Sequence, residues 1–343
     1  MSIIVSGLQC TCARFAEDIR NVVNDLRPDG LRVLPVLGVG GLQNLKDVLF
    51  LRSLDMAVVD QDNMILLKQK DPKLYADIER RVQYITKLYN AELHVLARDD
   101  IKSYQDLRGK MVNFNLKDSQ TEVTAERLFG MLNIPVEKTY YDNDESIRRL
   151  RAGELSAMIV VTGAPQVALA KLKKEDGVHF LPFDQDSAPG VDLAPVLTQY
   201  LPAELTSASY PNLIPEGTGV PTLANRALLV TYAWPEHSDR YRKVTKFVNE
   251  FFSKIDEFHT SSRHPKWSEI NLAADIPGWA RFKPAADWLA VHQKQEQSSN
   301  IQSAVGKLLA QYSSDSGHEL SQNDKEALLY KIKQLLGSKQ PAH

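Results

Sequence analysis

The chain has 343 residues, of which 43% are hydrophobic and 24% charged, and its formal net charge is −2 at pH 7. This length suits two globular domains with room for an appendage, and the composition is that of a soluble protein. The charge gives no electrostatic reason to expect nucleic acid or a membrane surface as partner, and no apolar run reaches the roughly 20 residues of a membrane-spanning helix.

The chain begins with Met1 and Ser2, and the apolar stretch IIV follows at residues 3–5. This start is typical of a first core strand and shows no signal peptide. Two interpretations stay open: the protein is cytoplasmic, or the numbering starts after a leader peptide that has been removed.

The first ninety residues alternate between short apolar strands and amphipathic helices. Strands are predicted at residues 2–6, 31–37, 55–60 and 82–88. Helices are predicted at residues 13–26 and 42–51, where apolar side chains recur every three or four positions. The order β-α-β-α-β-α-β requires a parallel sheet with helices on its faces.

A second α/β pattern starts at His94 and runs to about residue 182. Its predicted strands cover residues 94–98, 111–115, 138–141, 157–162 and 179–182. Its predicted helices start near Thr121 or cover residues 143–152 and 165–175. Residues 186–219 are rich in Pro, Ser and Gly and are interpreted as irregular connecting chain. A strand at 222–232 and an amphipathic helix at 239–258 follow.

The only two cysteines are Cys10 and Cys12. Cysteines separated by one residue seldom form a disulfide in extended chain, because their side chains point to opposite sides. The eight histidines are scattered and show no ligand spacing with the pair. We therefore expect no metal site and no cofactor, and we interpret the cysteines as small residues that line a loop.

Five loops are predicted at the carboxyl ends of strands, where open α/β sheets bind ligands. They are residues 7–12, 38–41, 60–62, 116–120 and 162–165. Loops from two domains can face one cleft, and helix starts in such a cleft offer unpaired backbone N–H groups to a small polar molecule. No nucleophile–base pair is evident, so we expect no catalytic residue.

Three blocks of sequence resemble a known family. They are GGLQNL at 40–45 with DMAVVDQD at 55–62; LYNAELHVLAR at 88–98 with DLRGKMVN at 106–113 and SQT at 119–121; and GELSA at 153–157 with VTGAP at 161–165. In this order and spacing, residues 1–290 resemble the TAXI-type extracytoplasmic solute-binding subunits of tripartite ATP-independent periplasmic (TRAP) transporters.

The resemblance implies a two-lobed type II periplasmic-binding-protein fold, α/β in class, with a central cleft. It implies lobe I at residues 1–91 and 218–292, lobe II at 92–217, and a linker with a C-terminal helical extension at 293–343. It further implies secretion to the periplasm, no enzymatic step, and a small carboxylate such as an amino acid or a dicarboxylate or keto acid as ligand. The ligand is delivered to membrane permease subunits, and we expect a monomer.

Candidate ligand-binding residues come from the matched blocks and from position in the cleft loops. They are Gln9, Thr11, Arg14, Gly40, Gly41, Asn44, Gln61, Asp62, Tyr89, Ser119, Gln120, Thr121, Thr162, Gly163 and Pro165.

Most of these candidates also have a purely structural interpretation. Ser119, Thr121 and Asn44 can contact the ligand or cap a helix. Asp62 can hold a ligand ammonium or cap the next helix, and Tyr89 can stack on the ligand or belong to the core. Arg14 is a possible carboxylate clamp or a solvated side chain.

Two departures from the family pattern bear on the ligand. The first loop, residues 7–12, lacks the glycine-rich start followed by aromatic residues. The later loop carries an added acid, Asp118, whose charge favours the helix dipole and can compete with an anionic ligand.

Two rival functions stay open, one of which involves the C-terminal tail. Residues 293–300 are a polar linker by composition, and two helix patterns follow at 301–312 and 322–336. The first rival is a ligand sensor that signals through these helices. The second is an enzyme on the same bilobed scaffold.

Overall fold

The computed structural model describes residues 1–293. Residues 1–285 form one compact unit, and residues 286–293 belong to a second unit, in which Trp288 and His292 stack with their ring centroids 3.5 Å apart. The predicted linker and C-terminal extension, from residue 294 on, lie outside the described residues. Among residues 1–293, no helix is both long and apolar enough to cross a membrane.

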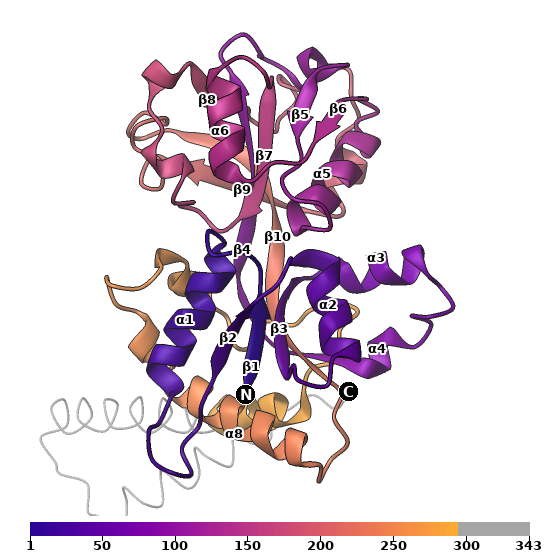
Figure 1. Cartoon of the computed structure of the whole chain (residues 1–343), viewed down its shortest axis with the longest axis vertical. Coiled ribbons are helices and arrows are strands. Elements are labelled where there is room, and N and C mark those ends of the chain that lie inside the picture. Colours follow the sequence, from indigo (N-terminus) through magenta and orange to yellow (C-terminus); the bar gives the residue numbers. More distant parts are fainter. Residues whose placement is uncertain (294–343) are drawn as a thin grey trace, which may run out of the picture. The chain divides into compact units, whose positions relative to one another are not determined.

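One continuous sheet organises the unit of residues 1–285 (Figure 1). Within the described chain it has ten strands in the order β2-β1-β3-β10-β4-β7-β5-β6, with β8 paired to β4 and β9 paired to β10. The strands are β1 Ser2–Val5, β2 Leu34–Leu37, β3 Met56–Asp60, β4 Val82–Arg98, β5 Met111–Asn113, β6 Glu137–Thr139, β7 Ala157–Thr162, β8 Val178–Phe180, β9 Leu201–Thr206 and β10 Gly219–Tyr232.

Helices cover this sheet in both of its halves (Figure 1). They are α1 Thr11–Val23, α2 Gly41–Phe50, α3 Asn63–Lys70, α4 Ile78–Arg81, α5 Gln120–Met131, α6 Asn143–Arg151, α7 Ala194–Leu197 and α8 Asp239–Ser253. The predicted helix at 165–175 is wrong, because only two short 3-10 turns occur there, at Leu169–Lys171 and Lys174–Asp176.

The two lobes are joined by two long strands that run through both. β4 pairs with β10 from Val82 to Glu92 and then with β7 from Glu92 to Ala97, so one strand replaces the two separate strands predicted at 82–88 and 94–98. The predicted α/β two-lobed fold is confirmed. The lobe boundaries after residues 91 and 217 stay predictions, because β4 continues without interruption through the first of them.

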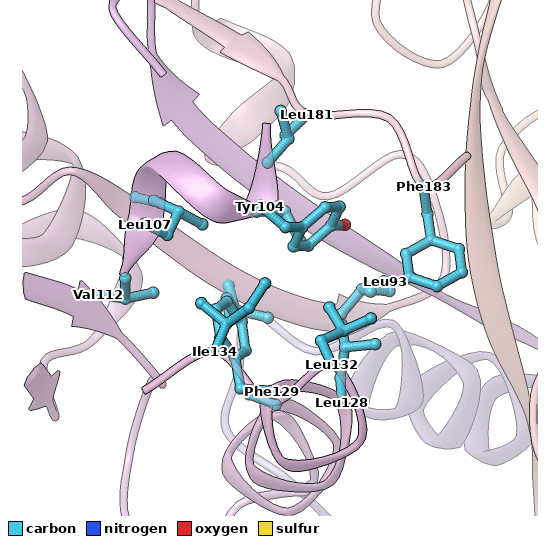
Figure 2. Packing of buried hydrophobic residues seen from close by; sticks show 14 of the residues in the cluster. Leu93, Tyr104, Leu107, Val112, Leu128, Phe129, Leu132, Ile134, Leu181 and Phe183 are labelled. Atoms are coloured by element: carbon cyan, nitrogen blue, oxygen red, sulfur yellow. The ribbon is translucent and has the colours of Figure 1, made fainter. Parts of the chain in front are cut away.

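Each lobe has its own apolar core. In lobe I, α2 and α3 pack Leu45, Val48 and Leu67 against the sheet. In lobe II, α5 contributes Leu128 and Phe129, which face Tyr104 and Val112 (Figure 2). Because each helix is fixed by such a buried stripe, the loop at its start is held in place at the gap between the lobes.

Candidate functional site

A cavity of about 480 Å³ lies between the lobes. Its walls come from loops that follow β1, β2, β5 and β7 and from the starts of α5 and α6. They are formed by Ser6, Gly7, Leu8, Gln9, Cys10, Leu37, Gly38, Val39, Asn115, Leu116, Ser119, Gln120, Thr121, Asp142, Asn143, Val160, Val161 and Thr162. The strand ends of both lobes therefore share one cavity.

A smaller cavity of about 40 Å³ adjoins it, here called the inner chamber. The two cavities have five wall residues in common, namely Ser6, Cys10, Gln120, Val161 and Thr162. The other walls of the inner chamber are Cys12, Gly40, Gly41, Asn44, Val58, Val59, Asp60, Tyr89 and Ala91.

Nine of the fifteen candidate residues line one or both cavities. They are Gln9, Gly40, Gly41, Asn44, Tyr89, Ser119, Gln120, Thr121 and Thr162. Their role in ligand binding stays a prediction. The other six, which line neither cavity, are Thr11, Arg14, Gln61, Asp62, Gly163 and Pro165.

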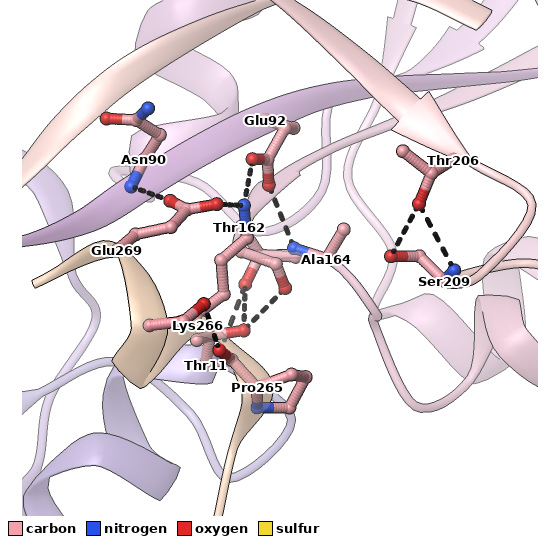
Figure 3. Close-up of polar contacts among 12 residues, drawn as sticks. Thr11, Asn90, Glu92, Thr162, Ala164, Thr206, Ser209, Pro265, Lys266 and Glu269 are labelled. Carbon is pink, nitrogen blue, oxygen red and sulfur yellow. Dashed lines mark hydrogen bonds and ion pairs between the residues drawn. The ribbon is translucent and has the colours of Figure 1, made fainter. Parts of the chain in front are cut away.

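Several of the six occupy contacts between the lobes or with other side chains. Thr11 donates its hydroxyl to the Gly163 carbonyl at 2.7 Å and its backbone N–H to Thr162 Oγ1 at 3.2 Å (Figure 3). Asp62 pairs with Arg127 of the other lobe at 3.4 Å. These bonds hold the lobes together directly.

The side chains of Arg14 and Gln61 are bonded to other parts of the protein. Arg14 pairs with Asp18 at 3.5 Å and donates to the Ser262 carbonyl. The Gln61 side chain accepts from Arg226 at 2.7 Å, and Pro165 follows a cis peptide bond. The first two side chains are therefore engaged away from the cavities.

Two glycines allow the lobes to approach closely. A Cβ added to Gly41 would lie 2.8 Å from the backbone nitrogen of Gln120 across the gap, and Gly41 also has φ +52°. A Cβ added to Gly163 would lie 3.0 Å from Thr11 Cγ2 and 3.1 Å from Tyr89 Cδ2. Any other residue at either position would push the lobes apart or displace these neighbours.

A buried ion cluster sits where β4 passes from one lobe to the other (Figure 3). Lys266 forms ion pairs with Glu92 and Glu269, and the Ala164 N–H donates to Glu92 Oε2 at 2.8 Å. Burial raises the pKa of Glu92, and the charge of Lys266 opposes this shift. Lys266 follows β10 and Ala164 follows β7, so Glu92 bonds to groups of both lobes.

Helix caps account for part of the polar lining. Ser119 Oγ accepts from the Glu122 N–H at 3.2 Å and caps α5, while Asp142 accepts from the Glu145 N–H at 2.9 Å and caps α6. Asn44 accepts from the Gly40 N–H and donates to the Val58 carbonyl, which ties α2 to β3.

The two cysteines form a disulfide, which corrects the prediction that they do not pair. Cys10 is the N-cap of α1 and Cys12 lies in its first turn, so the chain curls here instead of running extended. The curl brings the two Cα atoms to 5.2 Å, within the usual range for a disulfide.

A family model described as the NMT1-like family matches residues 38–277, well over half of the chain. The chain belongs to the NMT1-like family. The match runs from the loop after β2 to beyond β10 and so takes in parts of both lobes. No curated protein matches this NMT1-like chain.

Solved structures with a similar fold share little sequence with the NMT1-like chain. One is ArtJ, the arginine-, lysine-, histidine-binding protein from Geobacillus stearothermophilus, at 13% identity and TM-score 0.45, over 78% of this chain and 98% of that chain. Another is a ligand-binding component of an ABC-type import system from Staphylococcus aureus with zinc bound, at 11% identity and TM-score 0.44, over 83% of each chain.

A third is the periplasmic aliphatic sulphonate binding protein SsuA from Escherichia coli, at 12% identity and TM-score 0.42, over 85% of this chain and 87% of that chain.

The walls of the cleft in this NMT1-like protein carry acidic but no basic side chains. The wall residues of the two cavities include no lysine, arginine or histidine, whereas Asp60 and Asp142 are among them. Cationic walls occur in a separate groove of about 360 Å³ on lobe II, which includes Arg148, Arg151 and Lys171. There Arg148 pairs with Glu145 and Arg151 with Asp176.

The cavity walls also contain residues that the candidate list missed, above all Asp60 and the apolar Leu8, Leu37, Val39 and Leu116. A signal for Asp60 was present, because it ends a predicted strand and side chains alternate along a strand. In this NMT1-like chain Val58, Val59 and Asp60, the last three residues of β3, all line the inner chamber, and Val59 also packs in the lobe I core. No comparable signal marked the leucines.

Proposed function

We propose that this protein is a solute-binding receptor that closes its two lobes around one small molecule. The observation that carries the proposal is the cavity of about 480 Å³ whose walls come from both lobes. Its volume lies within the range of about 300–1,000 Å³ that is usual for small-molecule sites. A molecule in this cavity would contact strand ends and helix starts of both lobes.

The connections between the lobes suit a hinge. β4 and β10 join the lobes through continuous backbone. The other contacts between the lobes include the side-chain bonds of Asp62 with Arg127 and of Thr11 with Gly163 and the close approach of Gly41 to Gln120. Breaking such contacts opens the cavity without unfolding either core. Hinge closure of this kind couples ligand capture to a change in the outer surface.

The chemistry of the walls favours capture over conversion. Covalent catalysis needs a nucleophile beside a base, yet both thiols are joined in the Cys10–Cys12 disulfide and the cavity walls hold no histidine. Within residues 1–293, no group of three or more His, Cys, Asp or Glu residues is arranged to hold a metal ion. These observations support a receptor more than the enzyme alternative.

The family resemblance extends the proposal to the cellular role. On that basis the protein is a TAXI-type extracytoplasmic subunit of a TRAP secondary transporter, located in the periplasm as a monomer, that passes its ligand to membrane permease subunits. The resemblance also implies a carboxylate on the ligand. Such a group would depend on backbone N–H groups at the start of α5, since the walls supply no cationic side chain.

A thermal-shift screen of the full chain against amino acids, organic acids and amines tests the receptor proposal. A compound bound only by the folded protein stabilises it by about 2.7 kcal/mol at a concentration of 100 Kd. We expect one chemical class to raise the melting temperature. Turnover of a bound compound, or the absence of any shift across the panel, would contradict the proposal.

A blocked variant shows whether the shift arises in the cleft. Val39 lines the large cavity and is 41% exposed, so Val39→Trp fills space there without disturbing a core. Val167→Trp is the matched control, because Val167 is 62% exposed and lines neither cavity. Val39→Trp should abolish the shift, and Val167→Trp should retain it.

A further inference from the structure

One buried carboxyl group in the inner chamber has no partner. Asp60 is 8% exposed, and its backbone N–H donates to Asn63 Oδ1 at 3.1 Å. Within residues 1–293, its side-chain carboxyl group forms neither a hydrogen bond nor an ion pair. Its neighbour Asp62 is fully engaged, with Arg127 at 3.4 Å and Gln120 at 3.3 Å.

A second polar group without a partner faces the same chamber. Tyr89 is 2% exposed, and its ring packs on Phe15 with centroids 4.6 Å apart. Among the described side chains and backbone groups, none is hydrogen-bonded to its hydroxyl. Asp60 of β3 and Tyr89 of β4 both pair with Ala227 of the intervening β10, and both line the inner chamber. Burial, followed by the charge of Asp60, raises the pKa of Tyr89.

Buried polar groups are nearly always hydrogen-bonded, so an unpaired carboxyl and an unpaired hydroxyl on one chamber require an explanation. The inner chamber of about 40 Å³ has room for roughly three water-sized groups. It lies beside the larger cavity, with which it shares wall residues such as Gln120 and Thr162. A ligand in the larger cavity can therefore extend one small polar group into the chamber.

We propose that the inner chamber binds the protonated nitrogen of a small organic amine, held between the Asp60 carboxylate and the Tyr89 hydroxyl oxygen. The larger cavity then holds the apolar body of the same molecule against Leu8, Leu37 and Leu116. This inference rests on the proposed receptor function and names its ligand class.

Charge and wall composition favour an amine over other ligands. An ammonium group donates to both acceptors at once, and a charge-assisted bond to a buried carboxylate is strong. A carboxylate placed in the chamber would be repelled by Asp60, with no cationic wall residue to offset it. A metal ion would lack a sufficient ligand set, since no suitable cluster occurs among the described residues.

The burial of Asp60 supports the same assignment. Burial, followed by the charge of Asp62, raises the pKa of Asp60 well above its usual range. The titratable groups that interact electrostatically with Asp60 are Asp62, Tyr89 and Tyr200. An amine that enters the chamber provides the positive charge that the surrounding protein does not.

Isothermal titration of the full chain with three matched probes tests the assignment. Phenethylamine, 2-phenylethanol and 3-phenylpropionate share one ring and a short chain but end in a cation, a neutral hydroxyl and an anion. We expect phenethylamine to bind at least about tenfold more tightly than either of the others. Equal binding, preference for 3-phenylpropionate, or no binding of phenethylamine would overturn the inference.

Two substitutions locate the interaction. Asp60→Asn keeps the shape and removes the charge, and it should weaken phenethylamine binding at least about tenfold while leaving 2-phenylethanol unchanged. Asp118→Asn is the control, because Asp118 is an exposed acid in the loop before α5 that lines neither cavity. If both substitutions weaken phenethylamine binding equally, the preference for the cation arises from the overall charge of the protein, and the proposed role of Asp60 is wrong.

The outcomes separate the ligand class from the receptor function. If the thermal-shift screen finds organic acids and Val39→Trp abolishes their effect, the receptor proposal stands and the amine inference fails. If no compound of any class binds, both fail. Circular dichroism of Asp60→Asn establishes that a loss of binding does not reflect unfolding.

Discussion

Two buried carboxyl groups near the cleft have opposite surroundings. Glu92 on β4 is 4% exposed, pairs with Lys266 and accepts from the Ala164 N–H at 2.8 Å. Asp60 at the end of β3 is 8% exposed and, within residues 1–293, has no bond to its carboxyl group. Both lose hydration on folding, but only Glu92 recovers interactions inside the protein.

This difference separates a structural carboxylate from one available to a ligand. The partners of Glu92 come from both lobes, so its bonds fix the chain at the hinge. Asp60 lies on β3, which β10 separates from β4, and it lines the inner chamber. Strongly desolvated polar groups without internal partners are typical of binding sites. Substitutions at the two clusters should therefore have opposite effects on stability.

The largest effect should follow the loss of Lys266. Lys266→Met leaves the Glu92 carboxylate buried without its cation, and we expect a loss of about 3–5 kcal/mol in the free energy of unfolding. Chemical denaturation measures it. Lys138→Met, which removes a half-exposed pair with Glu126, should cost less than about 1 kcal/mol. If Lys266→Met also lowers the free energy of unfolding by less than about 1 kcal/mol, another group compensates the charge of Glu92.

Backbone geometry provides the next test. Gly41 and Gly109 both have positive φ, +52° and +67°, so an alanine at either should cost about 1–2 kcal/mol. An added Cβ at Gly109 meets nothing within 4 Å, whereas at Gly41 it meets Gln120 across the gap. Only Gly41→Ala should also weaken phenethylamine binding, by about tenfold. Calorimetry showing equal affinities for the two variants would contradict lobe closure at this point.

Asp60→Asn should stabilise the free protein by about 1–2 kcal/mol near pH 8, because the uncharged amide is cheaper to bury. Burial raises the pKa of Asp60 in the folded protein above its unfolded-state value of about 3.9. The neutral carboxyl group therefore contributes fully to stability below the unfolded-state pKa, and this contribution is lost as the pH rises through the folded-state pKa. The gain from the variant should therefore shrink toward pH 4. Denaturation curves across this range check it, and a constant gain would exclude titration of Asp60 as its cause.

The smallest expected effect separates capping from ligand contact at Ser119. Ser119→Ala and Ser238→Ala each remove a helix N-cap, and each should cost about 1 kcal/mol. Ser119 lines the large cavity, while Ser238 starts α8 and lines neither cavity. Both variants should lower the melting temperature by a similar amount, and only Ser119→Ala should change the affinity for phenethylamine. Unchanged affinity would leave Ser119 as a cap alone.

Sequence periodicity was sufficient to predict the two α/β halves and the loops that meet at the cleft. Strand ends such as residues 116–120 and 38–41 could be located because parallel strands end at one edge of a sheet. Periodicity did not indicate that β4 runs unbroken from Val82 to Arg98, because the pairing of β4 with β10 and β7 joins residues far apart in the sequence.

Side-chain partners were harder to predict than elements. The prediction included Asp62 and omitted Asp60, although Asp60 is the last residue of β3 and Asp62 follows it as the N-cap of α3. Arg127, which engages Asp62, and Lys266, which engages Glu92, lie 65 and 174 residues away along the chain. Likewise, the Cys10–Cys12 disulfide depends on the curl at the start of α1. Such pairings follow from the tertiary fold and not from local pattern.

The most direct test is a crystal structure of the chain grown with phenethylamine. The account predicts the amine nitrogen within hydrogen-bonding distance of the Asp60 carboxyl and the Tyr89 hydroxyl, with the phenyl ring in the cavity between the lobes. Phenethylamine bound outside that cavity, with only water beside Asp60, would contradict it.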